Sequence, residues 1–286
     1  MPNPVKSVAL VGKSESGEAL AIAKEISDAV LATGVSLVVE GQLAERLGRP
    51  PASLEQLRAC DLCVVTGGDG TLIRAAHLLG RAEVPIFGVN VGRLGFLTEA
   101  PRDRAVALLR RVLTGDYTAE PRLKLRVQLW REGQLLLEEE VLNDVVLNRG
   151  ATSRMVELRT IINGAPVSRF RADGLIVATP TGSTAYNLAA NGPILMPGAD
   201  GLVMNPICPH ALTQRPLVIS SRVKLCIEVT AAEGEVRLSL DGRAGSVLQT
   251  GDRVDLERTE GRVFLVRNPD LDFFGILREK LRWGES

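Results

Sequence analysis

The sequence lacks both a net charge and a segment suited to crossing a membrane. Lysine and arginine together number 34, as do aspartate and glutamate, so the chain has no long-range field to attract nucleic acid or an anionic membrane surface. The longest stretch without a charged residue, 174–199, is interrupted by proline and glycine, which argues against a transmembrane helix. We therefore expect a locally bound ligand, with neither nucleic acid nor membrane as a partner.

Cysteines and targeting signals are also scarce. Four cysteines are too few for a disulfide-stapled fold of this length. Cys60 and Cys63 form a Cys-x-x-Cys pattern, but no second pair stands at metal-binding spacing, and Cys63 lies in an apolar run where a thiol packs like a small hydrophobe. The apolar run that ends at Gly12 is too short for a signal peptide. The sequence thus predicts a cytoplasmic protein with no metal site of its own.

The length of 286 residues predicts two domains, and the pattern changes near residue 118. Before that point, β-branched runs alternate with segments of helical periodicity, which is typical of a parallel sheet covered by helices on both faces. We expect strands at 5–11, 36–39, 62–66 and 84–89, and helices at 17–32, 70–79 and 104–113. The first part of the chain is therefore predicted to be of the α/β class.

The second part of the chain is rich in short strands. They are expected at 123–130, 134–142, 156–162, 167–171, 223–230, 236–240, 253–258 and 263–267. Asn163-Gly164 predicts a hairpin between two of them. One short helix is expected at 182–190 and a terminal helix, which packs elsewhere, at 272–283. These patterns predict a second domain that is largely β.

The turn Gly67-Gly68-Asp69-Gly70 joins a buried strand to a helix expected to open at Thr71. In open α/β sheets, ligands bind at the carboxyl ends of the strands. Glycines there let backbone N–H groups approach a phosphate, and the following helix end adds a partial positive charge. The turn is therefore a candidate phosphate cradle. The alternative is a tight turn in which Asp69 merely caps the helix.

Two common nucleotide-binding motifs are absent. Residues 12–17 have the G-x-x-x-x-G spacing, but Glu18-Ala19 stand where a Walker A loop needs Lys-Ser/Thr. No G-x-G-x-x-G joins a strand to a helix, so the ordinary dinucleotide fingerprint is missing as well. A dinucleotide that binds this chain must do so in another way.

An acidic residue inside a phosphate loop repels the phosphate unless it takes a proton or meets a metal ion. Two roles therefore stay open for Asp69. It accepts a hydroxyl proton during phosphoryl transfer, or it contacts the Mg²⁺ that a nucleotide carries. Either role makes Asp69 the central residue of the site.

Two further segments carry suitable polar groups. Residues 173–186 are dense in hydroxyls; Ser183 and Thr184, at a helix N-terminus, can bind a ribose or a phosphate, and Tyr186 offers a flat face to a base. Asn143-Asp144 is another candidate, because an amide and a carboxylate can hold ribose hydroxyls. Ordinary cap and turn chemistry remains the alternative for both segments.

Five motifs occur in a fixed order along the chain. They are Gly67-Gly68-Asp69-Gly70-Thr71, residues 90–97 (NVGRLGFL), Asn143-Asp144, Arg171-Ala172-Asp173-Gly174 and Thr179-Pro180-Thr181-Gly182-Ser183-Thr184-Ala185-Tyr186. This order resembles that of bacterial NAD kinases over nearly the whole chain. The resemblance implies a Rossmann-like parallel-sheet domain (1–118), a β-sandwich-like domain for NAD binding and oligomerisation (119–258), and a C-terminal segment (259–286) whose helix returns to the first domain.

The resemblance also implies an enzyme, a kinase that transfers the γ-phosphoryl of ATP, or of polyphosphate in some members, to the 2′-hydroxyl of the adenosine ribose of NAD, giving NADP. Mg²⁺ or another divalent cation would accompany ATP, and subunits would pair into homodimers or homotetramers. Asp69 would be the catalytic proton acceptor. Binding roles would fall to Gly67, Gly68, Gly70, Thr71, Arg74, Asn143, Asp144, Arg154, Arg171, Asp173, Thr181, Thr184, Ala185, Tyr186, Asn187, Ala189 and Arg243.

Three residues depart from the family pattern. Asp144 stands where many members carry Glu and is shorter by one methylene, Asn191 replaces a frequent Gly, and Arg243 replaces a frequent Gln. These departures bear on the placement of the substrate, above all at Arg243.

Two other functions share part of this pattern. A lipid kinase of the diacylglycerol or sphingosine type has the Gly-Gly-Asp-Gly turn, but it would need an exposed apolar entrance or a basic membrane-facing patch. A non-catalytic NAD(P)-binding regulator would keep the ribose-binding segments without needing Asp69. His77 and His210 are expected to be packed or structural side chains rather than catalysts.

Overall fold

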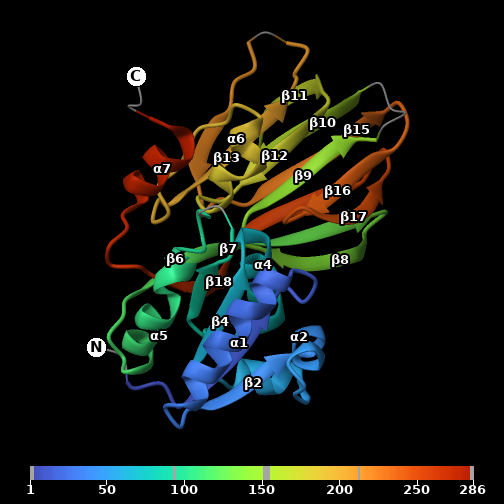
Figure 1. Cartoon of the computed structure of the whole chain (residues 1–286). Helices are drawn as coiled ribbons and strands as arrows, with labels where there is room; N and C mark the ends of the chain where they lie inside the picture. The colour runs from blue at the N-terminus through green and yellow to red at the C-terminus, as the bar shows by residue number, and fades with distance from the viewer. Residues whose placement is uncertain (1–2, 93–94, 151–154, 212, 284–286) are drawn as a thin grey trace. The chain divides into compact units, whose positions relative to one another are not determined.

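The structure is a computed structural model that describes residues 3–92, 95–150, 155–211 and 213–283. The chain divides into two compact units (Figure 1). Unit 1 comprises Met1–Pro121 and Val263–Ser286, and unit 2 comprises Arg122–Arg262. Within the described ranges, no helix is both long enough and apolar enough to span a bilayer.

Unit 1 is built on a parallel sheet with the strand order β5–β4–β1–β2–β3. The strands are β1 (Ser7–Gly12), β2 (Ser36–Glu40), β3 (Pro51–Ala52), β4 (Leu62–Gly67) and β5 (Ile86–Asn90), and β6 (Ala100–Pro101) pairs with β5. The direction of winding reverses between β1 and β4, and such a switch point leaves a crevice at the carboxyl ends of the strands. The turn that follows β4 therefore lies where ligands bind in this class of fold.

Helices cover both faces of this sheet, because its central strands are apolar on both sides. They are α1 (Gly17–Leu31), α2 (Gly41–Arg46), α3 (Leu54–Arg58), α4 (Asp69–Leu79) and α5 (Ala105–Leu113), which follows the short helix η1 (Arg102–Arg104). The C-terminal helix α7 (Phe273–Leu281) also belongs to unit 1. Val8 and Leu10 of β1 share a buried cluster with Ile26 of α1 and Leu109 of α5. The alternate residues of β1 are buried as well, as a strand covered on both faces requires.

Unit 2 consists of two antiparallel sheets. One has the order β14–β13–β12–β9–β16–β17, and the other contains β11–β10–β15–β18 together with β7 and β8. The strands are β7 (Ala119–Arg131), β8 (Gln134–Val141), β9 (Asp144–Arg149), β10 (Val156–Ile162), β11 (Ala165–Ala172), β12 (Gly174–Ala178), β13 (Gly201–Ile207), β14 (Leu217–Ser220), β15 (Leu225–Ala232), β16 (Val236–Leu240), β17 (Arg243–Leu248) and β18 (Arg253–Val266). The short helices η2 (Gly182–Thr184) and α6 (Tyr186–Ala189) follow β12.

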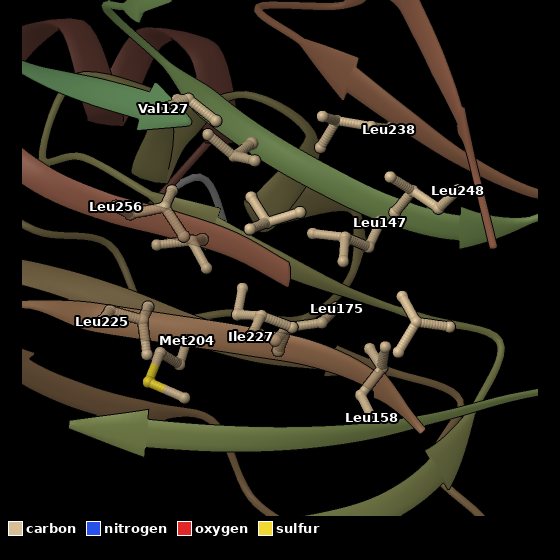
Figure 2. Close-up of a cluster of buried hydrophobic side chains, with 14 of the residues drawn as sticks. Val127, Leu147, Leu158, Leu175, Met204, Leu225, Ile227, Leu238, Leu248 and Leu256 are labelled. Carbon is tan, nitrogen blue, oxygen red and sulfur yellow. The ribbon is translucent and has the colours of Figure 1, made fainter. Parts of the chain in front are cut away.

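The core of unit 2 lies between its two sheets (Figure 2). Leu147 and Leu175 reach it from one sheet, and Leu158, Ile227 and Leu256 reach it from the other. Each fully buried aliphatic side chain of this kind contributes about 1.5–3 kcal/mol to folding. The packed sheets thus give a rigid support for the loops at their edges.

The predicted fold class is confirmed: unit 1 is a parallel α/β unit that includes the C-terminal helix, and unit 2 is β-sandwich-like. The expectation that Cys63 is a packed side chain is confirmed too, because it is buried in β4 and burial raises the pKa of its thiol. Three local expectations were wrong. The strands expected at 253–258 and 263–267 form one strand, β18, the helix expected at 182–190 breaks at Ala185, and α4 begins at Asp69 instead of Thr71.

Candidate functional site

The glycine turn of unit 1 is open on the side where a phosphate would approach. Gly68 is the N-cap of α4 and makes no side-chain bond to the helix, and a Cβ at Gly68 or Gly70 would meet no atom within 4 Å. At Gly67, by contrast, a Cβ would overlap the side chain of Thr71, so glycine is needed for the helix to start this close to the strand. Thr71 N and Leu72 N donate to the Gly68 carbonyl oxygen, so the start of α4 can present the N–H groups that precede them and its partial positive charge to an anion.

The carboxylate of Asp69 does not cap its own helix. Its Oδ1 accepts hydrogen bonds from Leu97 N at 3.0 Å, Thr98 N at 3.2 Å and Thr98 Oγ1 at 3.3 Å. Its Oδ2 accepts a hydrogen bond from Phe96 N at 2.8 Å. Because a carboxylate oxygen has about two lone-pair directions, Oδ1 is fully engaged and Oδ2 keeps capacity for one more donor.

A glycine makes this contact between the helix and the distant loop possible. A Cβ on Gly95 would overlap both Oδ1 of Asp69 and the hydroxyl of Thr98. The loop motif at 90–97 noted in the sequence therefore has a physical role, because its last two residues, together with Thr98, bring three consecutive N–H groups to Asp69. Arg93 and Leu94 of that motif lie outside the described residues.

Arg74 of α4 is engaged with the ends of two neighbouring strands. Its Nη1 lies 2.6 Å from Oε1 of Glu40, the last residue of β2, and its Nη2 donates to the carbonyl oxygen of Gly12, the last residue of β1, at 3.0 Å. The side chain of Arg74 is 44% exposed. The structure thus places this cation at the carboxyl ends of β1 and β2, and it reveals a partner, Glu40, that sequence reasoning did not find.

In unit 2, three strand ends meet at one edge of a sheet. Asp144 at the start of β9 pairs with Ala178 at the end of β12, and Val145 pairs with Leu240 at the end of β16. Thr179 N donates to the carbonyl oxygen of Asn143 at 2.9 Å. The residues Asn143, Asp144, Thr179 and Asp241 are consequently neighbours, although up to 98 positions separate them in the sequence.

Asp241 anchors this edge. Its Oδ2 accepts from Leu142 N at 2.9 Å, and its Oδ1 accepts from Asn143 N at 2.7 Å and Asp144 N at 3.1 Å. Burial of Asp144, which is 4% exposed, and then the nearby charge of Asp241 raise the pKa of Asp144 to about 7. Oδ1 of Asn143 is buried and has no hydrogen-bond partner among the described residues. The edge therefore holds a polar atom that a ligand can satisfy.

The hydroxyl-rich turn after β12 packs directly onto this edge. A Cβ on Gly182 would overlap the backbone of Asn143, and Gly182 N donates to Oγ1 of Thr179 at 3.1 Å. Thr181 is buried, and Thr184 Oγ1 donates to the Thr181 carbonyl oxygen at 3.2 Å. The predicted residues of this turn thus lie beside Asn143 and Asp144.

The short helix that follows contributes exposed and buried members of the predicted set. Tyr186 is 45% exposed, and Ala185 and Ala189 reach the surface at least in part. Asn187 is fully buried, and its amide donates to the carbonyl oxygens of Ser183 and Pro193, each at 3.0 Å. The side chain of Asn187 therefore holds the loop together from within.

Asn191 has a positive φ of 59°. Asn tolerates this left-handed conformation better than other residues that carry a side chain. The departure from the frequent glycine at this position therefore leaves the loop conformation accessible.

Arg171 and Asp173 lie at the other end of β12. The five residues of β12 put Asp173 about 20 Å along the strand from Thr179, at about 3.4 Å per residue. Asp173 accepts from Arg149 Nε at 2.7 Å, and Arg171 Nε donates to Glu157 at 3.0 Å. The structure does not bring this pair into the cluster around Asn143. Glu157 and Arg149 are ion-pair partners that sequence reasoning missed.

Two predicted residues remain. Arg243 follows the Asp241-Gly242 turn and pairs with Glu139 of β8 at 2.6 Å, so the Arg at this position, where Gln is frequent, has a partner on the protein itself. Arg154 lies outside the described residues.

Comparisons with known proteins cover both units. Residues 8–117 match the family model described as the ATP-NAD kinase N-terminal domain, and residues 142–268 match the ATP-NAD kinase C-terminal domain. The NAD kinase of Geotalea daltonii is 44% identical over 283 residues, covering 98% of this chain and 100% of that protein. The NAD kinase of Geobacter sulfurreducens is 40% identical over 285 residues, with the same coverage.

Solved structures show the same likeness. A yeast NADH kinase complexed with NADH superposes with a TM-score of 0.92 at 26% identity, covering 99% of this chain and 89% of that one. An NAD kinase from Archaeoglobus fulgidus in complex with ATP superposes with a TM-score of 0.74 at 28% identity, covering 96% and 98%. The resemblance inferred from the five motifs is thereby confirmed.

Proposed function

The chain belongs to the NAD kinase family. From this premise we propose that Asp69 accepts the proton of the NAD hydroxyl to which the enzyme transfers the phosphoryl group. The chain is an enzyme, a kinase that converts NAD to NADP. The hydrogen bonding of the two carboxylate oxygens of Asp69 is the observation that supports this role. The loop donors hold Oδ1 in place, whereas Oδ2 can still accept a hydroxyl hydrogen.

In this reaction the 2′-oxygen of the adenosine ribose forms a bond to the γ-phosphorus of ATP, and ADP leaves. The proton of the 2′-hydroxyl passes to Oδ2 of Asp69 as the new bond forms. Such transfers depend mainly on positioning and on electrostatic stabilisation. The fixed orientation of Asp69 supports this role, because the carboxylate needs no rearrangement to meet the hydroxyl.

The open glycine turn fits the phosphates of the donor. The space beside Gly68 and Gly70 and the uncapped start of α4 favour an anion there. Mg²⁺ or another divalent cation would neutralise the developing charge of the phosphoryl group. Among the described residues, no group of three or more His, Cys, Asp or Glu side chains could hold a metal ion. We therefore propose that the cation enters bound to the phosphates of ATP.

The edge of unit 2 fits the NAD side of the reaction. The Oδ1 of Asn143, which has no hydrogen-bond partner among the described residues, and the carboxyl of Asp144 are acceptors suited to ribose hydroxyls. Thr181 and Thr184 supply further hydroxyls, and the exposed ring of Tyr186 suits a base. Each unit thus carries one part of the proposed machinery.

We also propose that the chain associates into a homodimer or homotetramer. Arg171 and Asp173 lie at the far end of β12 from Asn143, so their contact with the same dinucleotide would need a second copy of the chain. Mixing inactive Asp69→Asn and inactive Asp173→Ala proteins tests this, because a mixed assembly would regain activity. A mixture that stays inactive, or a monomer by light scattering, would contradict the proposal.

A direct assay tests the function as a whole. Purified protein is incubated with NAD, Mg²⁺ and either ATP or polyphosphate, and NADP is followed with an NADP-specific dehydrogenase. NADP formation with ATP is the expected result, and the polyphosphate arm identifies a second donor. Tight NAD binding without NADP would instead favour a non-catalytic regulator. The expected cytoplasmic location stays a prediction.

A further inference from the structure

We propose that Asp241 is a positioning residue for NAD, whose carboxylate fixes the backbone of Asn143 and Asp144 and places a negative charge beside Asp144. The proposal rests on the role proposed above for Asn143 and Asp144 in binding the ribose. Asp241 itself belongs to a turn between two strands, and none of the binding roles inferred from the sequence includes it.

The first observation is that one carboxylate serves three consecutive backbone N–H groups. Leu142 and Asn143 lie between β8 and β9, where the chain leaves one ladder and has not yet joined the next. Asp241 accepts from the N–H groups of both residues and of Asp144, at 2.7–3.1 Å. A carboxylate that accepts several backbone N–H groups forms charge-assisted bonds of the stronger kind. The conformation of this segment therefore depends on Asp241.

The second observation is that the hairpin fixes Asp241 in turn. Asp241 and Gly242 both have positive φ, 51° and 73°, as a two-residue hairpin turn requires. Asp241 N also donates to the carbonyl oxygen of Asp144 at 3.0 Å. The carboxylate thus has a defined place relative to the start of β9.

For Asn143, these bonds fix the backbone from which its side chain projects. Its N–H is bonded to Asp241, and its carbonyl oxygen accepts from Thr179 N at 2.9 Å. Its Oδ1 is nevertheless buried without a hydrogen-bond partner in the described part of the chain. Buried polar atoms are normally paired, and a ribose hydroxyl would satisfy this one.

The consequence for Asp144 is electrostatic. Its ladder partner on β12, Ala178, is uncharged. On the other side the backbone N–H of Asp241 bonds to the carbonyl oxygen of Asp144, and the carboxylate of Asp241 is the charged group that acts on Asp144. Burial and the charge of Asp241 raise the pKa of Asp144 to about 7. An ionised carboxylate accepts hydrogen bonds from two hydroxyls, whereas a protonated one gives up part of that capacity. Binding of NAD should therefore weaken as the pH falls below about 7.

The experiment measures the KM for NAD and kcat between pH 5.5 and 8.5 at saturating Mg²⁺-ATP, together with equilibrium NAD binding. For the wild-type enzyme, KM should rise as the pH falls through the pKa of Asp144, because the protonated carboxyl accepts fewer hydrogen bonds from the ribose. In Asp241→Asn this rise should begin at lower pH, because the neighbouring negative charge is gone. Its KM at pH 8.5 should increase several-fold, since an amide cannot accept all three N–H groups, and kcat at saturating NAD should change less than KM.

A second variant separates charge from geometry. Asp241→Glu keeps the charge but displaces it, so the pH of the transition should stay near the wild-type value while KM at pH 8.5 rises. It also gives an answer if Asp241→Asn fails to fold. Asp144→Asn should remove the transition. Asp200→Asn is the control, because Asp200 bonds to Ser221 and Arg222 elsewhere in unit 2 and should leave the wild-type profile unchanged.

The outcomes are distinguishable. A wild-type enzyme that makes no NADP from NAD and ATP would overturn the proposed function and this inference with it. If the wild-type enzyme is active but Asp241→Asn shows the same transition and the same KM at pH 8.5, the inference alone fails. Equal losses of kcat and of NAD affinity at every pH in both Asp241 variants would indicate a purely structural residue and would also overturn it.

Discussion

The hydroxyl of Thr98 lies 3.3 Å from Oδ1 of Asp69, which stands 29 positions earlier in the chain. The backbone N–H of Thr98 reaches the same oxygen at 3.2 Å. The carboxylate is thereby turned toward the loop after β5 and away from the N-terminus of its own helix. Asp69, the central residue of the site predicted from the sequence, is thus oriented by a segment outside the glycine turn.

Asp69→Asn tests the proton acceptor. Loss of a general base costs about 10²–10⁴ in rate, so kcat should fall by that factor while the Kd for NAD changes less than about threefold. Single-turnover NADP formation and calorimetric NAD titration measure the two quantities. Asp28→Asn, at an exposed position of α1, is the matched control and should keep full activity. An Asp69→Asn enzyme with wild-type kcat would remove the assignment.

Gly95→Ala tests the loop that holds Asp69. The added methyl group would overlap Oδ1 of Asp69 and the hydroxyl of Thr98, so the loop or the carboxylate must shift. Displacement of a catalytic group by about 1 Å can cost about 100-fold, and we expect a loss of kcat of at least tenfold. Gly92→Ala is the control, because a Cβ there meets nothing within 4 Å. Equal activity of the two variants would show that the loop does not orient Asp69.

The buried carboxyl of Asp144 should make stability depend on pH. Its pKa is raised from 3.8 to about 7, so the folded state binds the proton more tightly than the unfolded state. The contribution of this one carboxyl to stability is then highest below about pH 4 and falls as the pH rises to 7. Asp144→Asn removes this loss, and the variant should be more stable than the wild type at pH 8, by on the order of 4 kcal/mol. Urea unfolding at pH 4.5 and 8 measures the difference, and a difference that does not grow with pH would contradict the assignment.

The layers of both units could be predicted from the sequence, because buried strands and helices show a characteristic spacing of apolar residues. The strand expected at 156–162 is β10 with the same bounds. Asn163 and Gly164 have the positive φ values, 50° and 82°, that an Asn-Gly hairpin needs. Such features depend on neighbours in the chain, and a single sequence displays them directly.

The partners of the site residues could not be predicted in the same way. Glu40 meets Arg74 because β2 lies beside β1, and Glu157 meets Arg171 because β10 and β11 pair in a particular register. Asp241 reaches Asn143 because β16 and β9 are neighbours in the sheet. These contacts depend on strand order and register, which are set by the packing of the whole unit.

Substitutions of Asn191 test whether asparagine replaces the frequent glycine because it tolerates a positive φ. Its φ of 59° costs most residues about 1–2 kcal/mol relative to glycine or asparagine. We expect Asn191→Val to lower the stability by at least that amount and Asn191→Gly to be close to neutral. Equilibrium urea unfolding compares them. If both variants unfold like the wild type, backbone strain at this position does not matter for the fold.

The side chain of Glu99 should make the strongest single interaction between the C-terminal segment and the rest of unit 1. It is 4% exposed, its Oε1 lies 2.6 Å from Arg267 Nη1, and its Oε2 accepts from Asn268 N at 3.0 Å. Removing one partner of a buried ion pair costs about 3–5 kcal/mol, so Glu99→Ala should lower the free energy of unfolding by about 3 kcal/mol, the lower limit, because Glu120 remains near Arg267. The matched control is Glu18→Ala, whose pair with Arg102 is exposed and should contribute less than about 1 kcal/mol. Equal losses in the two variants, measured by urea unfolding, would show that burial does not strengthen the tie.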